Sequence, residues 1–312
     1  MAVVAWIAVA SPATSAALVP SVRAESVSGL TAKEKLSGKG ADEQRVDDCK
    51  VPAAQRTRPD RPTDCAAAPE LAAKLTADAV ISAIKDATPS SPPRLAGQDL
   101  SGLDLTDLDF RRADLRGANL FGAKLVGANL SGADLSGANL DAAWLMRTNF
   151  AGANLASASL FGPVVYPTLD VTPANAPNFE NANLAGARIV ARLNRVNMRG
   201  SNLAGARMGV DMRNQPMGQM RVDLSGADLS GANLVGADLN RAVIAFARLT
   251  KADLRKANLF RADLSGSDLT AADLTGADVT EADLYGATIK DVRGFDELVG
   301  FDKARNREKI IQ

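Results

Sequence analysis

Cys49 and Cys65 are the two residues of this chain whose chemistry is easiest to define from sequence. Closing the short loop between them with a disulfide is worth about 3 kcal/mol in the chain-entropy model. An even cysteine count favours a disulfide in an exported chain, and two reduced, unrelated thiols are the alternative. A zinc site is disfavoured, because the chain has no histidine and no further cysteine to complete the ligand set.

The lack of histidine also bears on catalysis. Without it, the 312 residues cannot form a Ser–His or Cys–His relay, and the commonest protein general base is missing. The sequence has no nucleophile motif, no glycine-rich phosphate loop after a strand, and no paired carboxylates in an evident cleft. We therefore expect a protein that is not an enzyme and needs no cofactor.

Two clusters of oxygen and sulfur ligands are candidates for metal binding. Six acidic residues follow one another near the C-terminal end without an intervening Lys or Arg: Asp263, Asp268, Asp273, Asp278, Glu281 and Asp283. Five of the seven methionines lie between Met198 and Met220. A divalent cation or Cu(I) would suit these ligands. The sequence favours backbone hydrogen bonds for the carboxylates and apolar packing for the thioethers, so no metal site is predicted.

A leucine, or a residue that replaces it, recurs at every fifth position in two long runs, Leu100–Leu160 and Leu224–Ile289. In an α-helix this period would spread the leucines over every face, and in a strand it would alternate them between two faces. Keeping them on the inside needs a bend every five residues, for which the adjacent Gly, Asp and Asn are suited. The pattern predicts a coil lined by Leu and Ala, with successive coils paired by backbone hydrogen bonds.

Single units such as Ala118–Gly122 (ANLFG) and Ala227–Gly231 (ADLSG) show the pattern in full. In them the chain resembles the pentapeptide repeat proteins, and the resemblance covers roughly residues 95–291. It implies an all-β solenoid, a right-handed quadrilateral parallel β-helix with short helical caps and four repeats per coil. The open ends of such a stack expose unpaired backbone and need those caps.

The N-terminal quarter of the chain has a different composition. Residues 1–24 are typical of a secretory signal peptide, with a nine-residue apolar run, Ala2–Ala10, and a small-x-small cleavage site at Val22–Ala24. Residues 25–66 form a flexible polar segment that contains both cysteines. The mature protein is therefore expected in the periplasm or outside the cell, with no membrane span after signal removal.

Both ends of the repeat are expected to be capped by helices. Residues 67–90 are predicted to form an N-terminal cap helix, because larger apolar residues follow a narrow stripe in an alanine-rich segment that ends before Pro92. Residues 292–312 are predicted to form a C-terminal cap helix. Its apolar residues cap the last coil or pair two molecules end to end as a homodimer.

Two loops and a change of phase interrupt the repeat. The loops are predicted at residues 163–178 and 209–221, which are rich in proline and methionine respectively. The phase slips between Ile189 and Leu193, which are four residues apart. Loops on a rigid scaffold often carry recognition, so these interruptions are candidate contact sites.

Aromatic and basic residues at outward positions are the candidate partner-binding residues. They are Phe121, Phe161, Tyr166, Arg188, Arg192, Arg199, Arg207, Arg213 and Arg221. Exposed rings mark partner surfaces, and a basic band attracts an anionic partner. The alternatives are rings covered by their neighbours and arginines that are only solvated, and the sequence favours these alternatives.

We therefore interpret the chain as a non-enzymatic exported scaffold that binds an unidentified protein partner. The alternative is a DNA mimic, because some pentapeptide repeat proteins resemble duplex DNA and protect type II topoisomerases from fluoroquinolones. The signal sequence, the net charge of zero and the basic middle oppose that alternative. No binding to nucleic acid is expected either, since no overall positive charge attracts it.

Overall fold

The computed structural model describes residues 75–88, 91–166, 172–210 and 221–312. The chain divides into two compact units, Met1–Ala68 and Pro69–Gln312, and every described residue belongs to the second. The predicted signal peptide, the polar segment 25–66, both cysteines and Arg213 lie outside the described residues. No helix among the described residues is long and apolar enough to cross a membrane.

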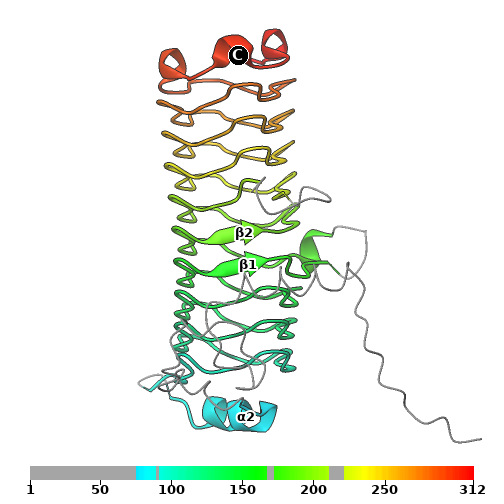
Figure 1. Cartoon of the computed structure of the whole chain (residues 1–312), viewed down its shortest axis with the longest axis vertical. Coiled ribbons are helices and arrows are strands. Elements are labelled where there is room, and N and C mark those ends of the chain that lie inside the picture. The colour runs from blue at the N-terminus through cyan, green and yellow to red at the C-terminus, as the bar shows by residue number, and fades with distance from the viewer. Residues whose placement is uncertain (1–74, 89–90, 167–171, 211–220) are drawn as a thin grey trace, which may run out of the picture. The chain divides into compact units, whose positions relative to one another are not determined.

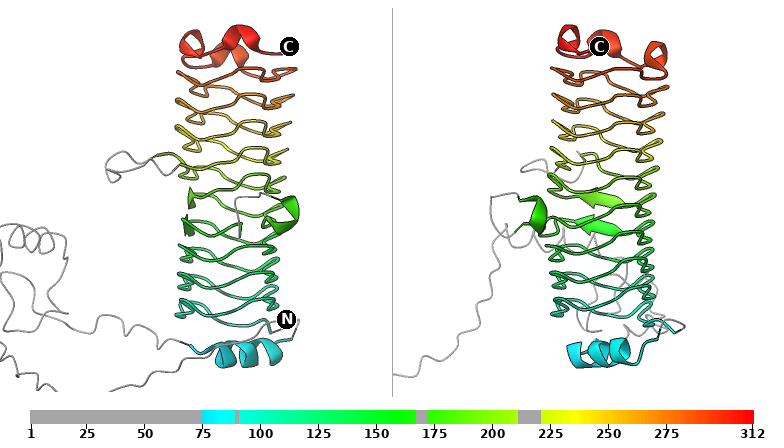
Figure 2. Two further views of the ribbon diagram at one scale, coloured as in Figure 1. Left: turned by 90° about the vertical axis from the view of Figure 1, so that its right-hand side faces the viewer. Right: turned by 180° about the vertical axis from the view of Figure 1, so that it is seen from behind.

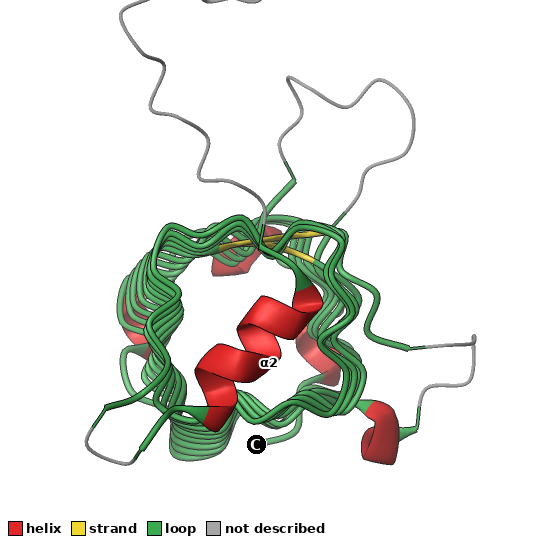
Figure 3. Cartoon of the chain, turned by 90° about the horizontal axis from the view of Figure 1, so that it is seen from below, coloured by secondary structure: helices red, strands yellow, loops and turns green. Residues whose placement is uncertain are grey.

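The second unit is a stack of parallel coils, each with four sides (Figures 1 and 3). On each side, the residue before the core leucine forms a parallel β-bridge with its counterpart one coil away, as in Asp99–Asn119–Asn139. In the regular coils these partners are 20 residues apart. Four ladders of bridges therefore run along the stack, and we number the sides by the ladders that begin at Arg94, Asp99, Asp104 and Asp109.

Among the described residues, only two segments are extended enough to form strands, β1 (Ser159–Phe161) and β2 (Arg188–Val190). They pair in parallel on the second side, with Leu160 opposite Ile189. The side that contains β2 has four residues instead of five between ladder positions 188 and 192, so its backbone lacks the usual corner. Elsewhere the bends leave single bridges, which explains why a chain full of parallel pairing shows so little regular strand.

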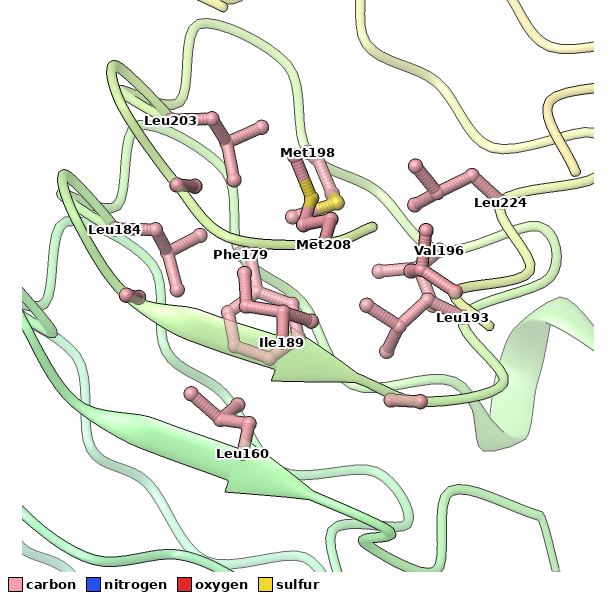
Figure 4. Close-up of a cluster of buried hydrophobic side chains, with 14 of the residues drawn as sticks. Leu160, Phe179, Leu184, Ile189, Leu193, Val196, Met198, Leu203, Met208 and Leu224 are labelled. Carbon is pink, nitrogen blue, oxygen red and sulfur yellow. The ribbon is translucent and has the colours of Figure 1, made fainter. Parts of the chain in front are cut away.

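Leucine and alanine fill the interior, as the period of five predicts. The central leucines are buried along the whole stack, and in most repeats an alanine two residues earlier is buried beside the leucine. Fully burying one leucine side chain contributes about 1.5–3 kcal/mol. Where the repeat is least regular, Met198 and Met208 occupy leucine positions inside the stack (Figure 4).

Many corners are held by an Asp or Asn that precedes the core leucine. The Oδ1 atom of Asp134, for example, accepts a hydrogen bond of 3.0 Å from the backbone N–H of Ser136. The next residue, Gly137, then turns the chain with a φ of 67°. In the described part of the chain, sixteen residues other than glycine adopt such positive φ values, which L-residues do at a cost of about 1–2 kcal/mol.

The acidic run near the C-terminal end serves the same purpose. Asp263, Asp268, Asp273, Asp278 and Asp283 each accept a backbone N–H two residues later. Asp253 and Asp273 stack on one ladder, as the repeat predicts. The hydroxyl and N–H of Thr275 nevertheless hold the pKa of Asp273 below its usual value, although the nearby Asp253 opposes that shift. Backbone hydrogen bonding therefore explains the five aspartates of this run, whereas Glu281 forms an ion pair with Arg261.

At the N-terminal end of the stack, α2 (Ala77–Lys85) lies across the first coil (Figure 3). Thr76 caps the helix by accepting the N–H of Ala79. Val80 is fully buried in the core, and the N–H of Leu75 donates to the carbonyl oxygen of Asp99. The helix therefore joins the end of the core, and within the predicted range 67–90 it ends at Lys85.

At the other end, the single cap helix predicted over residues 292–312 is wrong. Three isolated 3₁₀ turns are found instead: η3 (Phe295–Glu297), η4 (Phe301–Lys303) and η5 (Arg307–Lys309). Ladder positions 293, 299, 305 and 311 are six residues apart, so the chain makes one last coil with longer corners. The rings of Phe295 and Phe301 meet edge to face with centroids 4.9 Å apart.

Both interruptions leave the register of the ladders intact. Asn149 and Asn178 are bridge partners although they are 29 residues apart, so the first insertion adds nine residues to a coil. It contains η2 (Pro173–Asn175). Asn202 and Asn233 are partners at a separation of 31, so the second insertion adds eleven. The phase slip is visible as a separation of 19 between Asn183 and Asn202.

Candidate interaction surface

The third side of the stack is the one that both insertions border. The first insertion leaves the coil after Val164 on the third side, and the chain returns at Asn178 on the fourth. The second leaves after Arg207 on the second side, and the chain returns at Asp223 on the third. We call the third side the loop face. Figure 2 (left) shows it towards the viewer, with η2 at one edge.

Three exposed aromatic side chains lie on the loop face: Trp144, Phe246 and Tyr285. Their exposed fractions are 42%, 74% and 59%. Trp144 is a ladder residue, and the other two follow the ladder residues Val243 and Asp283 on the same side. These three rings are not among the binding residues predicted from the sequence. The period of five already places each of them at an outward position, so that signal was present.

The two predicted phenylalanines lie on the second side. Phe121 and Phe161 follow ladder residues Asn119 and Ser159, which are two coils apart, as predicted. Phe121 is 52% exposed. The Arg188 guanidinium carbon lies 4.3 Å from the centroid of the Phe161 ring, a cation–π contact that partly covers it. Only Phe121 of this pair offers an open ring.

Tyr166 anchors the start of the first insertion. It is half-buried against the core, and its hydroxyl donates a hydrogen bond to the carbonyl oxygen of Asn194 in the next coil. Burial raises the pKa of Tyr166 to about 12. Its polar end is therefore occupied within the molecule.

The predicted basic residues do not form one face. Arg188 and Arg207 are bridge partners on the second side, whereas Arg192 is on the third. Arg199 follows ladder residue Asn197 on the fourth side. Arg221 comes just before Asp223, where the chain rejoins the loop face. Of these, Arg192 and Arg221 come together, because both line one groove.

The candidate metal ligands predicted from the sequence are the acidic run and the clustered methionines. Within the described residues, no three or more acidic or cysteine side chains are grouped so that they could hold a metal ion. Met198 and Met208 are buried in the core. Met212, Met217 and Met220 lie outside the described residues.

Comparison with known proteins identifies the repeat. A family model described as pentapeptide repeats matches eight copies, at residues 94–125, 113–152, 133–162, 223–259 and 252–291. No curated protein matches the chain.

Several solved structures resemble the chain. One is HetL, a pentapeptide repeat protein involved in heterocyst differentiation regulation in the cyanobacterium Nostoc sp. strain PCC 7120, with 26% identity over 76% of this chain and 100% of that one, at a TM-score of 0.30. A pentapeptide repeat protein from the Arabidopsis thaliana thylakoid lumen is 27% identical over 51% of this chain and 77% of that one, with a TM-score of 0.22. QnrB1, a plasmid-mediated fluoroquinolone resistance protein, is 19% identical over 67% of this chain and 95% of that one, with a TM-score of 0.30. With TM-scores this low, the assignment rests on the repeat units.

Proposed function

Because the chain is a pentapeptide repeat protein over residues 94–162 and 223–291, we propose that it is a non-enzymatic, exported scaffold that binds a protein partner through its loop face. The observation that carries this proposal is the position of both insertions. They interrupt the stack at the two edges of one side, and that side also carries Trp144, Phe246 and Tyr285.

The packing of the stack favours binding over catalysis. Small aliphatic side chains fill its interior, and the corner carboxylates are engaged by their own backbone. Exposed aromatic rings are costly to leave in water, and they are enriched at the centres of protein interfaces. A flat, rigid side with three such rings suits a protein surface better than a small substrate.

Site-specific crosslinking in cells tests the face directly. A photoreactive amino acid at position 246, on the loop face, should capture the partner. The same photoreactive amino acid placed at position 256, at an exposed corner of the first side opposite the loop face, should not capture the partner. Equal capture at both positions, or capture only at position 256, would contradict the proposal.

Substitution of the rings provides an independent measurement. Trp144→Ala and Phe246→Ala should weaken partner capture by about tenfold or more, as truncating a central aromatic residue does. Phe121→Ala is the matched control, because it removes a ring of exposure intermediate between the other two that follows a ladder residue of the second side. All three variants should keep their melting temperatures, since exposed side chains contribute little to stability.

Cell fractionation tests the proposed export. The mature protein should be found in the periplasm or the medium, starting near residue 25. Recovery from the cytosol with residues 1–24 intact would contradict export. If that protein also protected DNA gyrase from a fluoroquinolone, the DNA-mimic alternative would replace this proposal.

A further inference from the structure

The shortened side of the fifth coil leaves a groove at the edge of the loop face. One residue fewer than in a regular repeat separates Arg188 from Arg192. Val190 and Ala191 are buried there at 7% and 6% exposure. The groove has a volume of about 450 Å³, and eight residues line it: Gly162, Pro163, Val190, Ala191, Arg192, Arg221, Asp223 and Val243.

The groove combines an apolar floor with a basic rim. Pro163, Val190 and Ala191 are buried at its base, whereas Arg192 and Arg221 are exposed at its edge. Neither arginine forms an ion pair with another described residue, although seven such pairs occur elsewhere in the described part of the chain. Two guanidinium groups that have no carboxylate partner among the described residues therefore line one groove.

The one acidic residue in the groove is engaged by its own corner. Oδ1 of Asp223 accepts hydrogen bonds from the backbone N–H of Ser225 at 3.0 Å and from its hydroxyl at 2.6 Å. Arg195 follows on the same side, and Arg188 and Arg207 lie on the neighbouring second side. Positive charge therefore exceeds negative charge around the groove.

We propose that this groove binds an extended segment of an acidic protein partner, with a carboxylate between Arg192 and Arg221 and a small apolar side chain on Val190 and Ala191. The inference rests on the proposed function and names the chemistry of the partner. Arginine forms strong, charge-assisted hydrogen bonds with carboxylates. The neighbouring apolar residues favour a ligand that has an apolar side chain, which a free anion lacks.

An anionic membrane is the competing occupant, because arginine and exposed aromatic rings also suit lipid headgroups. The buried floor disfavours it. A bilayer presents a broad surface that contacts protruding side chains, whereas Val190 and Ala191 lie at the base of a narrow groove. A single extended chain reaches such a floor.

The experiment measures binding of a fluorescein-labelled peptide of alternating valine and glutamate to the mature full-length chain by fluorescence anisotropy. The double variant Arg192→Glu/Arg221→Glu should weaken binding by about tenfold or more, since it replaces attraction with repulsion. Arg199→Glu, an exposed arginine on the fourth side, is the matched control and should leave the affinity within about twofold.

Several outcomes would overturn the inference. Lack of peptide binding, or an equal loss in Arg199→Glu, shows that the groove is not a specific site. Binding of phosphatidylglycerol vesicles that the double variant abolishes, without peptide binding, assigns the groove to lipid. If the double variant still captures the cellular partner through position 246, the proposed scaffold function stands and only the groove's role fails.

Discussion

Phe150 and Phe179 stack face to face in the core, with ring centroids 4.9 Å apart and an angle of 1° between the ring planes. They occupy equivalent positions in successive coils, although the first insertion separates them by nine more residues than a regular coil does. The backbone N–H of Phe150 donates to the carbonyl oxygen of Asn178 at 2.7 Å. The coil therefore closes beneath the insertion in the regular register.

This relationship predicts that the first insertion can be removed. Deleting residues 168–176 restores the regular spacing, and Pro167→Gly is needed with it, because the new corner requires a positive φ that proline cannot adopt. The variant should fold and keep its melting temperature within a few degrees by circular dichroism. Loss of cooperative unfolding would show that the insertion is part of the solenoid's core.

Ser201 predicts a stabilising substitution. It occupies the inward alanine position, is fully buried, and its hydroxyl has no hydrogen-bond partner among the described residues. Ser201→Ala should therefore raise the free energy of unfolding by about 1 kcal/mol, measured by urea denaturation.

Ser267 is the matched control for that measurement. It is equally buried at the same inward position, but its hydroxyl donates to the carbonyl oxygen of Leu264 at 2.7 Å. Ser267→Ala should leave stability unchanged or lower it slightly. A gain as large as that of Ser201→Ala would mean that the small-residue preference, and not the unsatisfied hydroxyl, sets the effect.

Gly294 predicts a destabilising substitution at the start of the last coil. Its φ is 68°, and a Cβ added there would lie 2.4 Å from Cα and 2.5 Å from the backbone nitrogen of Thr275. Gly286 has a similar φ, but a Cβ there meets nothing within 4 Å. Gly286→Ala should cost about 1 kcal/mol.

Gly294→Ala should cost clearly more than Gly286→Ala, because backbone atoms must move to relieve the contact. Urea denaturation measures both variants, and hydrogen exchange should show the extra loss concentrated in residues 292–312. Equal costs in the two variants would contradict the close approach of the last coil to Thr275.

Tyr166 predicts a change in stability at alkaline pH. Burial raises its pKa to about 12 from an ordinary value of 10.0, so the folded state favours the protonated phenol. The resulting stabilisation is complete below pH 10 and is lost as the pH rises through about 12. Tyr285→Phe leaves one tyrosine, whose ultraviolet absorbance should report a midpoint near pH 12 in the folded protein and near pH 10 in urea. A folded midpoint near pH 10 would contradict the burial of this side chain.

Much of this architecture is readable from local sequence because each repeat makes the same contacts as its neighbours. Leu120 is inward, Asn119 holds a corner and Gly122 turns the chain for reasons contained in five residues. The prediction for residues 292–312 failed because the same coil continues there with six-residue sides, and the tests for a period of five do not detect that change.

The sequence alone therefore determined the period, the inward leucines, the turn chemistry and the places where the repeat is interrupted. Only the tertiary structure decided which side of the stack the interruptions share, because that depends on how many residues each insertion adds to a coil and on the one residue that the phase slip removes. The same summation brings Arg192 and Arg221 to one groove and separates both from Arg199. The coil and the side on which a residue lies depend on the length of every preceding repeat, so no local pattern specifies them.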